Sequence, residues 1–204
     1  MRAVEIVPGL LRWTAPHPDW NARAAPGSSG DWDEQVGSVL YELPDAVALI
    51  DPLLPSEDRA AFLDWLDERI GGRPVSILTT IRWHRRDREE LAERYRSTTS
   101  RAWNAVPAGI TPHPLRGAGE TMFWLPAVAA LVAGDRLIGA RGGGLQVCPQ
   151  SWLEDVHVDR PALVELLRAL VELPIERVLV SHGEPVLRDG AAALVRAIAQ
   201  AAES

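Results

Sequence analysis

The chain has 204 residues, of which 47% are hydrophobic and 24% are charged, as in ordinary globular proteins. Its 21 basic and 28 acidic residues give a formal net charge of −7, which disfavours nucleic acid and anionic membranes as partners. The single cysteine, Cys148, excludes a disulfide within the chain and favours a reducing, cytoplasmic location. The sequence lacks both the long apolar run of a membrane span and the pattern of a secretory signal, so we expect neither.

Predicted strands alternate with predicted helices along the chain. Apolar stretches bounded by turn residues predict strands over 4–7, 10–13, 36–43, 46–50, 75–80, 100–106, 121–125, 129–133 and 177–181. Helical spacing of apolar residues predicts helices over 56–70, 87–95 and 159–173 and from 189 onward. Ser56 is the predicted N-cap of the first helix, and Gly71 its end. The order indicates one α/β domain over residues 1–204.

Several segments between these elements have the composition of loops. Residues 15–31 are rich in Pro, Gly and Ser and predict a surface loop, in which His17 would be placed to fold over a site. His113 stands between two prolines and is also expected in an exposed loop. Three tryptophans in polar or loop contexts are candidates for lining a cleft, namely Trp20, Trp32 and Trp152.

Three apolar strands end in side chains that can bind a metal ion or move protons. The strand over 75–80 is followed by His84 and Asp87, the strand over 129–133 by Asp135, and the strand over 177–181 by His182. Binding sites in α/β sheets form at strand ends, where side chains from separate elements converge. Asp135 and His182 each have a neighbouring glycine, which permits the tight turn that presents the side chain.

The succession of these motifs resembles the metallo-β-lactamase superfamily over nearly the whole chain. Residues 131–135 (Leu-Val-Ala-Gly-Asp) are similar to the Gly-Asp element of that family. Residues 178–185 (Val-Leu-Val-Ser-His-Gly-Glu-Pro) are closely similar to its last histidine element, and residues 47–51 to the strand before its first helix. The resemblance implies a four-layer αββα sandwich, with a metal site at the edge between the two sheets.

The main motif of the family, Thr-His-x-His-x-Asp-His, is matched only in part. His84 takes the position of the second histidine, with Thr80 shortly before the motif. Arg82 and Arg86 stand where the first histidine and the aspartate are expected, and Asp87 stands at the last histidine position. The separate histidine of the family is missing from residues 116–119. The resemblance therefore implies a degenerate metal-binding motif.

The matching ligands are His84, Asp135 and His182. They are too few for the two full coordination shells of a two-metal site. One zinc, iron or manganese ion held by two nitrogens and one oxygen, with an open position for water, is chemically acceptable. Such an ion would activate water for attack on an ester, thioester or amide.

The arginines and Asp87 have different roles in the hypotheses that stay open. In a hydrolase, Asp87 would orient the metal ion or accept a proton, and Arg82 or Arg86 would stabilise the developing oxyanion. In a metal-free binding protein, the same arginines would neutralise Asp135 or Asp87, or would hold a small organic anion between tryptophans. A third hypothesis is a structural or partner-binding subunit without a small-molecule site.

Overall fold

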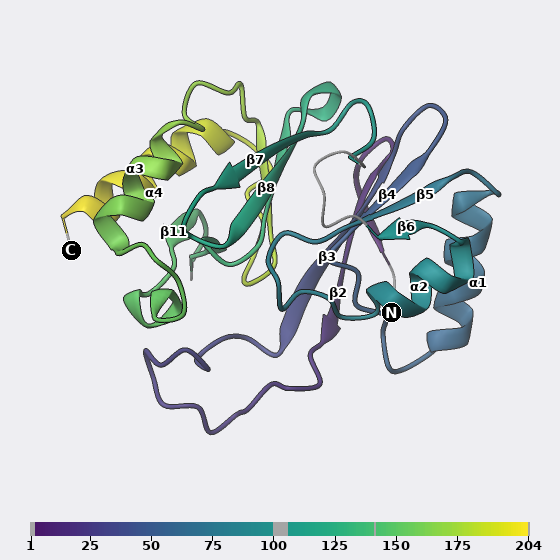
Figure 1. Cartoon of the computed structure of the whole chain (residues 1–204), viewed down its shortest axis with the longest axis horizontal. Helices are drawn as coiled ribbons and strands as arrows, with labels where there is room; N and C mark the ends of the chain where they lie inside the picture. Colours follow the sequence, from purple (N-terminus) through teal and green to yellow (C-terminus); the bar gives the residue numbers. More distant parts are fainter. Residues whose placement is uncertain (1–2, 100–105, 141, 204) are drawn as a thin grey trace.

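Two β-sheets pack face to face, and helices cover both outer faces, in the computed structural model of the chain (Figure 1). The structure describes residues 3–99, 106–140 and 142–203. Apolar side chains fill the space between the sheets and the space under the helices on each side. This arrangement confirms the αββα sandwich that the sequence predicts.

The first sheet is formed by the N-terminal half of the chain. Its strands are, in spatial order, β1 (Val4–Val7), β2 (Leu10–Pro16), β3 (Gln35–Glu42), β4 (Val47–Ile50), β5 (Val75–Leu78) and β6 (Thr98–Thr99). Helices α1 (Arg59–Ile70) and α2 (Arg88–Tyr95) cover its outer face. Because successive side chains of a strand point to opposite faces, Leu49 packs under these helices, whereas Ala48 and Ile50 face the other sheet.

The second sheet is formed by the C-terminal half. Its strands are, in spatial order, β12 (Arg177–Val180), β9 (Ala130–Ala133), β8 (Glu120–Leu125) and β7 (Thr111–Leu115). Helices α3 (Arg160–Arg168) and α4 (Gly190–Ala202) pack on its outer face through Leu163 and Leu194 among others. A separate hairpin consists of β10 (Leu137–Gly139) and β11 (Leu145–Val147), and short 3₁₀ helices span Pro126–Val128 (η2) and Gln150–Leu153 (η3).

Most predicted elements are confirmed, with shifts at their ends. The first helix begins at Arg59, so the predicted cap Ser56 is wrong; the N-cap is Asp58, whose backbone is left-handed at φ 55°. Gly71 ends this helix in the left-handed conformation, as predicted. Asp159 caps α3 through the backbone N–H of Ala162, but that helix ends at Arg168 rather than at 173.

Strands β7, β10 and β11 were not predicted. Pro112 and Pro114 argue against a strand over 111–115, but β7 is the edge of its sheet, where proline is tolerated. The prediction of an exposed loop at His113 is therefore wrong, because this residue lies in β7 and is half-buried. The hairpin of β10 and β11 has strands too short to give a periodic signal. The predicted strand over 100–106 lies almost wholly outside the described residues.

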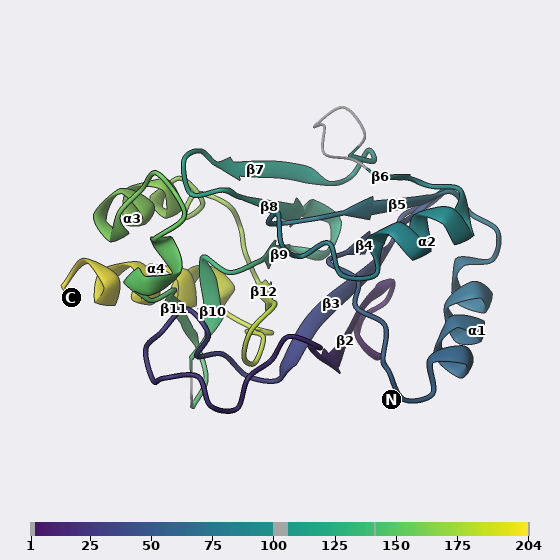
Figure 2. The same ribbon diagram turned by 60° about the horizontal axis from the view of Figure 1, so that its bottom comes forward.

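The two sheets are bridged at one end of the sandwich. Single β-bridges join Val36 to His182 and Ile81 to Glu120, and the N–H of Gly37 donates to the carbonyl of Ser181. The long loop over residues 17–34, which connects β2 to β3 (Figure 2), reaches η3, where the hydroxyl of Ser151 donates to the carbonyl of Gly27. In the described part of the chain no helix is long and apolar enough to cross a membrane.

Candidate metal centre

Three predicted ligands meet at this bridged end. His84, Asp135 and His182 come from the segments after β5, β9 and β12, and one ligand atom of each lies within 4.8 Å of the others. Oδ1 of Asp135 is 3.0 Å from Nε2 of His84 and 3.3 Å from Nε2 of His182. All three residues are buried. These separations are close to the ~3.3 Å edge of a tetrahedron whose metal–ligand bonds are about 2.0–2.1 Å.

The imidazole of His84 is oriented by Asp51, which follows β4. Nδ1 of His84 lies 2.9 Å from Oδ2 of Asp51, so Nε2 is turned toward Asp135. The carboxylate of Asp51 also accepts hydrogen bonds from the backbone N–H of Thr80, at 2.8 Å, and from its hydroxyl. A carboxylate on the second nitrogen of a histidine is the usual support for a metal-binding imidazole.

Asp135 is oriented from its other oxygen. The indole N–H of Trp83 donates to Oδ2 at 2.5 Å, and Oδ1 is left facing the two histidines. The backbone N–H groups of Gly134, Asp135 and Arg136 donate to the buried carboxylate of Glu120, which fixes this turn. A Cβ on Gly134 would lie 2.4 Å from the hydroxyl oxygen of Thr80, so the approach requires glycine.

The charged groups of the site shift one another's pKa values. Burial by itself lowers the pKa of His84, but the carboxylates of Asp135 and Asp51 outweigh it and raise that pKa to about 9. Burial opposes ionisation of Asp135, but His84 and His182 outweigh it and hold the pKa of Asp135 below its usual range. The imidazolium of His84 is thus a counter-charge of both carboxylates, together with the guanidinium of Arg86. Burial, followed by the charge of Asp135, raises the pKa of Glu120 to about 7.

The two arginines of the motif lie in different surroundings. Arg86 adopts a left-handed backbone at φ 43°, and its Nη1 donates to the carbonyls of Gly37 and Asp51, each at 2.7 Å. Its side chain lines the pocket above the three ligands. Arg82 is largely exposed, and its guanidinium lies 3.9 Å from Asp155 at the surface. The direct polar partners of Asp135 are imidazoles and an indole, and the charge of Arg86 acts on it only from a longer range.

The structure places Asp87 away from the three ligands. It is the N-cap residue of α2, and its carboxylate accepts from the backbone N–H of Leu54 at 2.6 Å and from Arg59 at 2.9 Å. Asp87 is absent from the residues that line the pocket. Its predicted role as metal-orienting group or proton acceptor is not supported, because its oxygens already stabilise the segment before α1.

A pocket of about 320 Å³ opens over the ligands. The loop over residues 17–34 forms one wall, as expected, and η3 forms another; Ser151 Oγ donates to the carbonyl of Gly27 and joins the two. The rings of Trp32 and Trp152 lie 5.4 Å and 5.2 Å from the ring of His182. The lining consists of His17, Asp19, Ser29, Trp32, Trp83, His84, Arg86, Asp135, Ser151, Trp152, Glu154, Asp155 and His182.

The prediction of cleft-lining tryptophans is confirmed for Trp32 and Trp152. Trp20 is not in the lining; its indole N–H instead donates to the carbonyl of Trp32 at 2.9 Å and supports the wall from behind. Trp83 lines the pocket without having been predicted to.

Sequence reasoning missed the residues that orient the ligands. In the sequence, Asp51 is recognisable only as the residue at which a strand ends, and Trp83 only as the residue before His84. Arg136 is fully buried; it donates to the carbonyls of Ala118 and Trp152, and its guanidinium lies 5.6 Å from the ring centre of Trp83. A buried charge in the turn after β9 has no periodic signal, although Gly134 marks the turn itself.

No protein-family model matches the chain, and no curated protein matches it in sequence. Solved structures match over nearly its whole length. A metallo-beta-lactamase from Erythrobacter litoralis with beta-mercaptoethanol in its active site has a TM-score of 0.62 and 15% identity, covering 99% of this chain and 96% of that one. The mono-zinc form of a metallo-beta-lactamase from the same organism has a TM-score of 0.64 and 14% identity, covering 100% and 97%.

A metallo-beta-lactamase family protein from Thermus thermophilus has a TM-score of 0.55 and 17% identity, covering 97% of this chain and 81% of that one. These identities are low, and the likeness lies in the arrangement of the elements. The chain therefore has the metallo-β-lactamase fold, with a His-Asp-His cluster where its two sheets are bridged.

Proposed function

We propose that the chain is a hydrolase-like protein that holds one divalent metal ion, zinc in the first instance, and cleaves an ester, thioester or amide of a small molecule. One observation carries the proposal. Oδ1 of the buried Asp135 faces Nε2 of both His84 and His182, at 3.0 Å and 3.3 Å, which is metal-ligand spacing. The zinc-bound state of one structural neighbour supports the choice of a single ion.

The residues around the ligands fit this role. Asp51 contacts Nδ1 of His84, and Trp83 donates to Oδ2 of Asp135; these two ligand atoms would point away from the ion. Nε2 of His84 and Oδ1 of Asp135 are therefore oriented toward the ion before it binds. A bound zinc ion would supply Lewis acidity, which lowers the pKa of water and polarises a carbonyl group. Arg86 adds a fixed positive charge on the pocket wall, where an oxyanion would develop.

His17 is a candidate base in the pocket lining. Burial, followed by the charge of Arg86, lowers the pKa of His17 below its usual 6.5, so the imidazole is neutral at pH 7 and able to accept a proton. We assign the proton-accepting role to His17 in place of Asp87. The proposal keeps the cytoplasmic location expected from the single cysteine.

Elemental analysis of the full chain, purified without an affinity tag or chelator, tests the proposal. We expect about one equivalent of zinc, iron or manganese, as a single site of this kind requires. The variant His182→Ala should lose the metal, whereas His157→Ala, which removes an exposed histidine, should keep it. Absence of metal from the wild-type protein, together with no thermal stabilisation by added zinc, would overturn the proposal in favour of a metal-free protein.

A further inference from the structure

We propose that the small molecule bound in this pocket carries a cationic head group of the quaternary ammonium type, which sits between Trp32 and Trp152 at the acidic mouth of the pocket. This inference rests on the proposed function for the location of the reacting bond. It adds the class of ligand, and it differs from the organic anion that the arginine-rich motif predicts.

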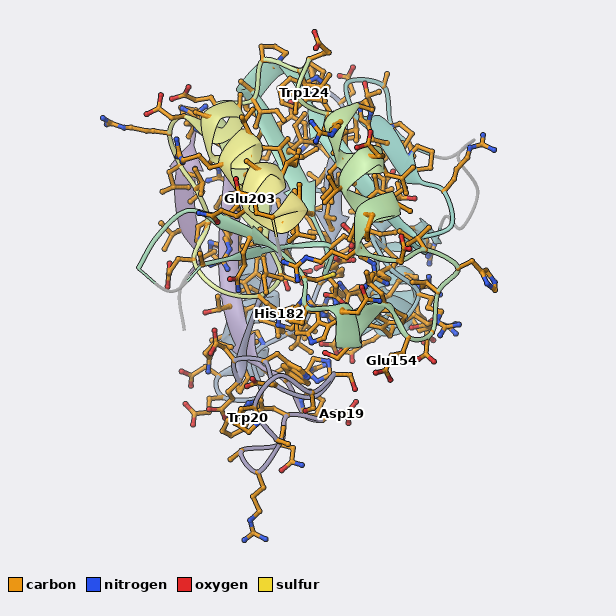
Figure 3. All side chains as sticks on the ribbon, turned by 90° about the vertical axis from the view of Figure 1, so that its left-hand side faces the viewer. Asp19, Trp20, Trp124, Glu154, His182 and Glu203 are labelled. Atoms are coloured by element: carbon orange, nitrogen blue, oxygen red, sulfur yellow. The ribbon has the colours of Figure 1, made fainter. Side chains whose placement is uncertain are left out.

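Carboxylates outnumber guanidiniums in the lining of the pocket. Asp19 comes from the loop over residues 17–34, and Glu154 and Asp155 directly follow η3, so acidic side chains reach the mouth from two separate segments. Figure 3 shows Asp19 and Glu154 on the same face of the molecule, below His182. With Asp135 at the floor, four carboxylates line the pocket against one guanidinium, that of Arg86.

The positive charges nearby offset this excess only in part. Arg86 contributes one positive charge, which the carbonyls of Gly37 and Asp51 hold on the pocket wall. The guanidinium of Arg82 lies 3.9 Å from Asp155, but the two side chains are 68% and 82% exposed. The attraction within such an exposed ion pair is weak, because water screens both charges. A divalent ion at the floor would still leave the lining net negative, and the excess lies at the mouth.

The aromatic walls give the second observation. The rings of Trp32 and Trp152 pack steeply inclined to the ring of His182, with interplanar angles of 67° and 76°, and both line the pocket. The faces of such rings favour an alkylated cation over an anion, because the ring quadrupole is negative there. The ring of Trp83 is already approached by the guanidiniums of Arg82 and Arg136, at 5.2 Å and 5.6 Å.

The floor of the pocket offers an unsatisfied polar atom to a ligand. Nδ1 of His182 is buried without a hydrogen-bond partner, and His182 lines the pocket together with Asp135. A ligand with a polar reacting end would match the polar floor of the pocket. A compact alkylated cation at its other end would match the tryptophans and carboxylates at the mouth. The apolar walls would hold the methyl groups of the cation, while the exposed carboxylates supply long-range attraction.

Three probes of nearly equal shape test the charge preference, with tryptophan fluorescence of the full chain as the readout. They are choline, its uncharged analogue 3,3-dimethylbutan-1-ol and the anion 3,3-dimethylbutanoate. We expect choline to bind about fivefold or more tightly than the alcohol, as cation–π contacts allow, and the anion to bind most weakly. Equal binding of choline and the alcohol, or tighter binding of the anion, would overturn the inference.

Variants separate the contributions of charge and ring. Glu154→Gln and Asp19→Asn should each weaken choline binding by about threefold at low salt and leave the alcohol unaffected. Trp32→Leu should remove most of the preference for choline while keeping an apolar wall. Asp45→Asn, which changes the net charge equally at the turn between β3 and β4, is the matched control and should alter nothing. An effect of Asp45→Asn equal to that of Glu154→Gln would contradict a local cause.

The same titrations are run on zinc-loaded and on chelator-treated protein, so that this inference and the metal proposal can fail separately. A chain that holds zinc but does not prefer choline keeps the proposed function and loses the cationic ligand. A chain that prefers choline but holds no metal keeps the cationic ligand and loses the hydrolase mechanism.

Discussion

At the scale of single residues, the candidate metal centre depends on how each ligand is held from behind. Asp51 contacts Nδ1 of His84, and the indole N–H of Trp83 donates to Oδ2 of Asp135. Nε2 of His84 and Oδ1 of Asp135 therefore point toward each other. His182 lacks a hydrogen bond at Nδ1 and is held by the rings of Trp32 and Trp152. The ligands are thus oriented partly by hydrogen bonds and partly by packing.

Removing the indole N–H tests this orientation. Trp83→Phe keeps an aromatic ring but frees Oδ2 of Asp135, and we expect zinc affinity to fall by about 10-fold or more, as for other groups that support metal ligands. Competition with a chromophoric chelator measures the change. Trp65→Phe, in α1 and remote from the pocket, should keep the wild-type affinity. An unchanged affinity in Trp83→Phe would show that the bond to Asp135 does not orient it.

At the scale of elements, the site exists because β3 and β12 come together at one end of the two sheets. The N–H of Gly37 in β3 donates to the carbonyl of Ser181, at 2.7 Å, directly before His182. Arg12 in β2 reaches across to the carbonyls of Val180 and Gly183. The His182 turn is therefore anchored to the first sheet, while its own strand belongs to the second.

A methyl group at Gly37 should break this junction. A Cβ there would lie 2.6 Å from the carbonyl oxygen of Val180 and 2.8 Å from Nη2 of Arg12. Since backbone must move to admit it, we expect Gly37→Ala to destabilise the fold by about 1–3 kcal/mol and to weaken zinc binding. Urea unfolding measures the stability. Gly30→Ala, whose new methyl would meet chiefly the side chain of Ala24 at 3.3 Å, should cost less than about 1 kcal/mol. Equal losses in the two variants would contradict the junction.

At the scale of the whole molecule, buried ionisable groups couple folding to pH. The pKa of His84 is about 9 in the fold against 6.5 in a free side chain, so its stabilising contribution is complete below pH 6.5 and is lost as the pH rises through 9. The pKa of Glu120 is raised from 4.5 to about 7, so its contribution is likewise lost as the pH rises through 7. The lowered pKa of Asp135 acts oppositely and protects the fold above pH 3.8.

The chelator-treated protein should therefore become less stable between about pH 5 and pH 9. The midpoint of urea unfolding, measured in this range with excess chelator, should fall as the pH rises. With saturating zinc the decline above about pH 7 should shrink, because the ion takes the place of the proton on His84. A midpoint that stays constant or rises toward the alkaline end would contradict the charged state of His84.

The sequence by itself determined much of the fold and the identity of the candidate ligands. Strong apolar patterns placed β3, β4, β9 and β12 within a few residues, because such strands are buried on both faces and leave a local signal. Edge and hairpin strands such as β7 and β10 escaped, because their partners and not their own residues stabilise them. His84, Asp135 and His182 were named from motifs because each follows a recognisable strand.

The tertiary structure alone decided how the other charged groups are used. Asp87 and Arg82 stand close to His84 in the sequence, yet Asp87 binds Leu54 and Arg59 before and in α1, and Arg82 reaches the surface. Asp51, 33 residues away, holds the imidazole instead. The acidic mouth likewise joins Asp19 to Glu154 across most of the chain. The sequence specifies which candidate ligands are present, because strand patterns are local; which groups orient and surround them depends on contacts between distant segments, which only the packed sandwich brings together.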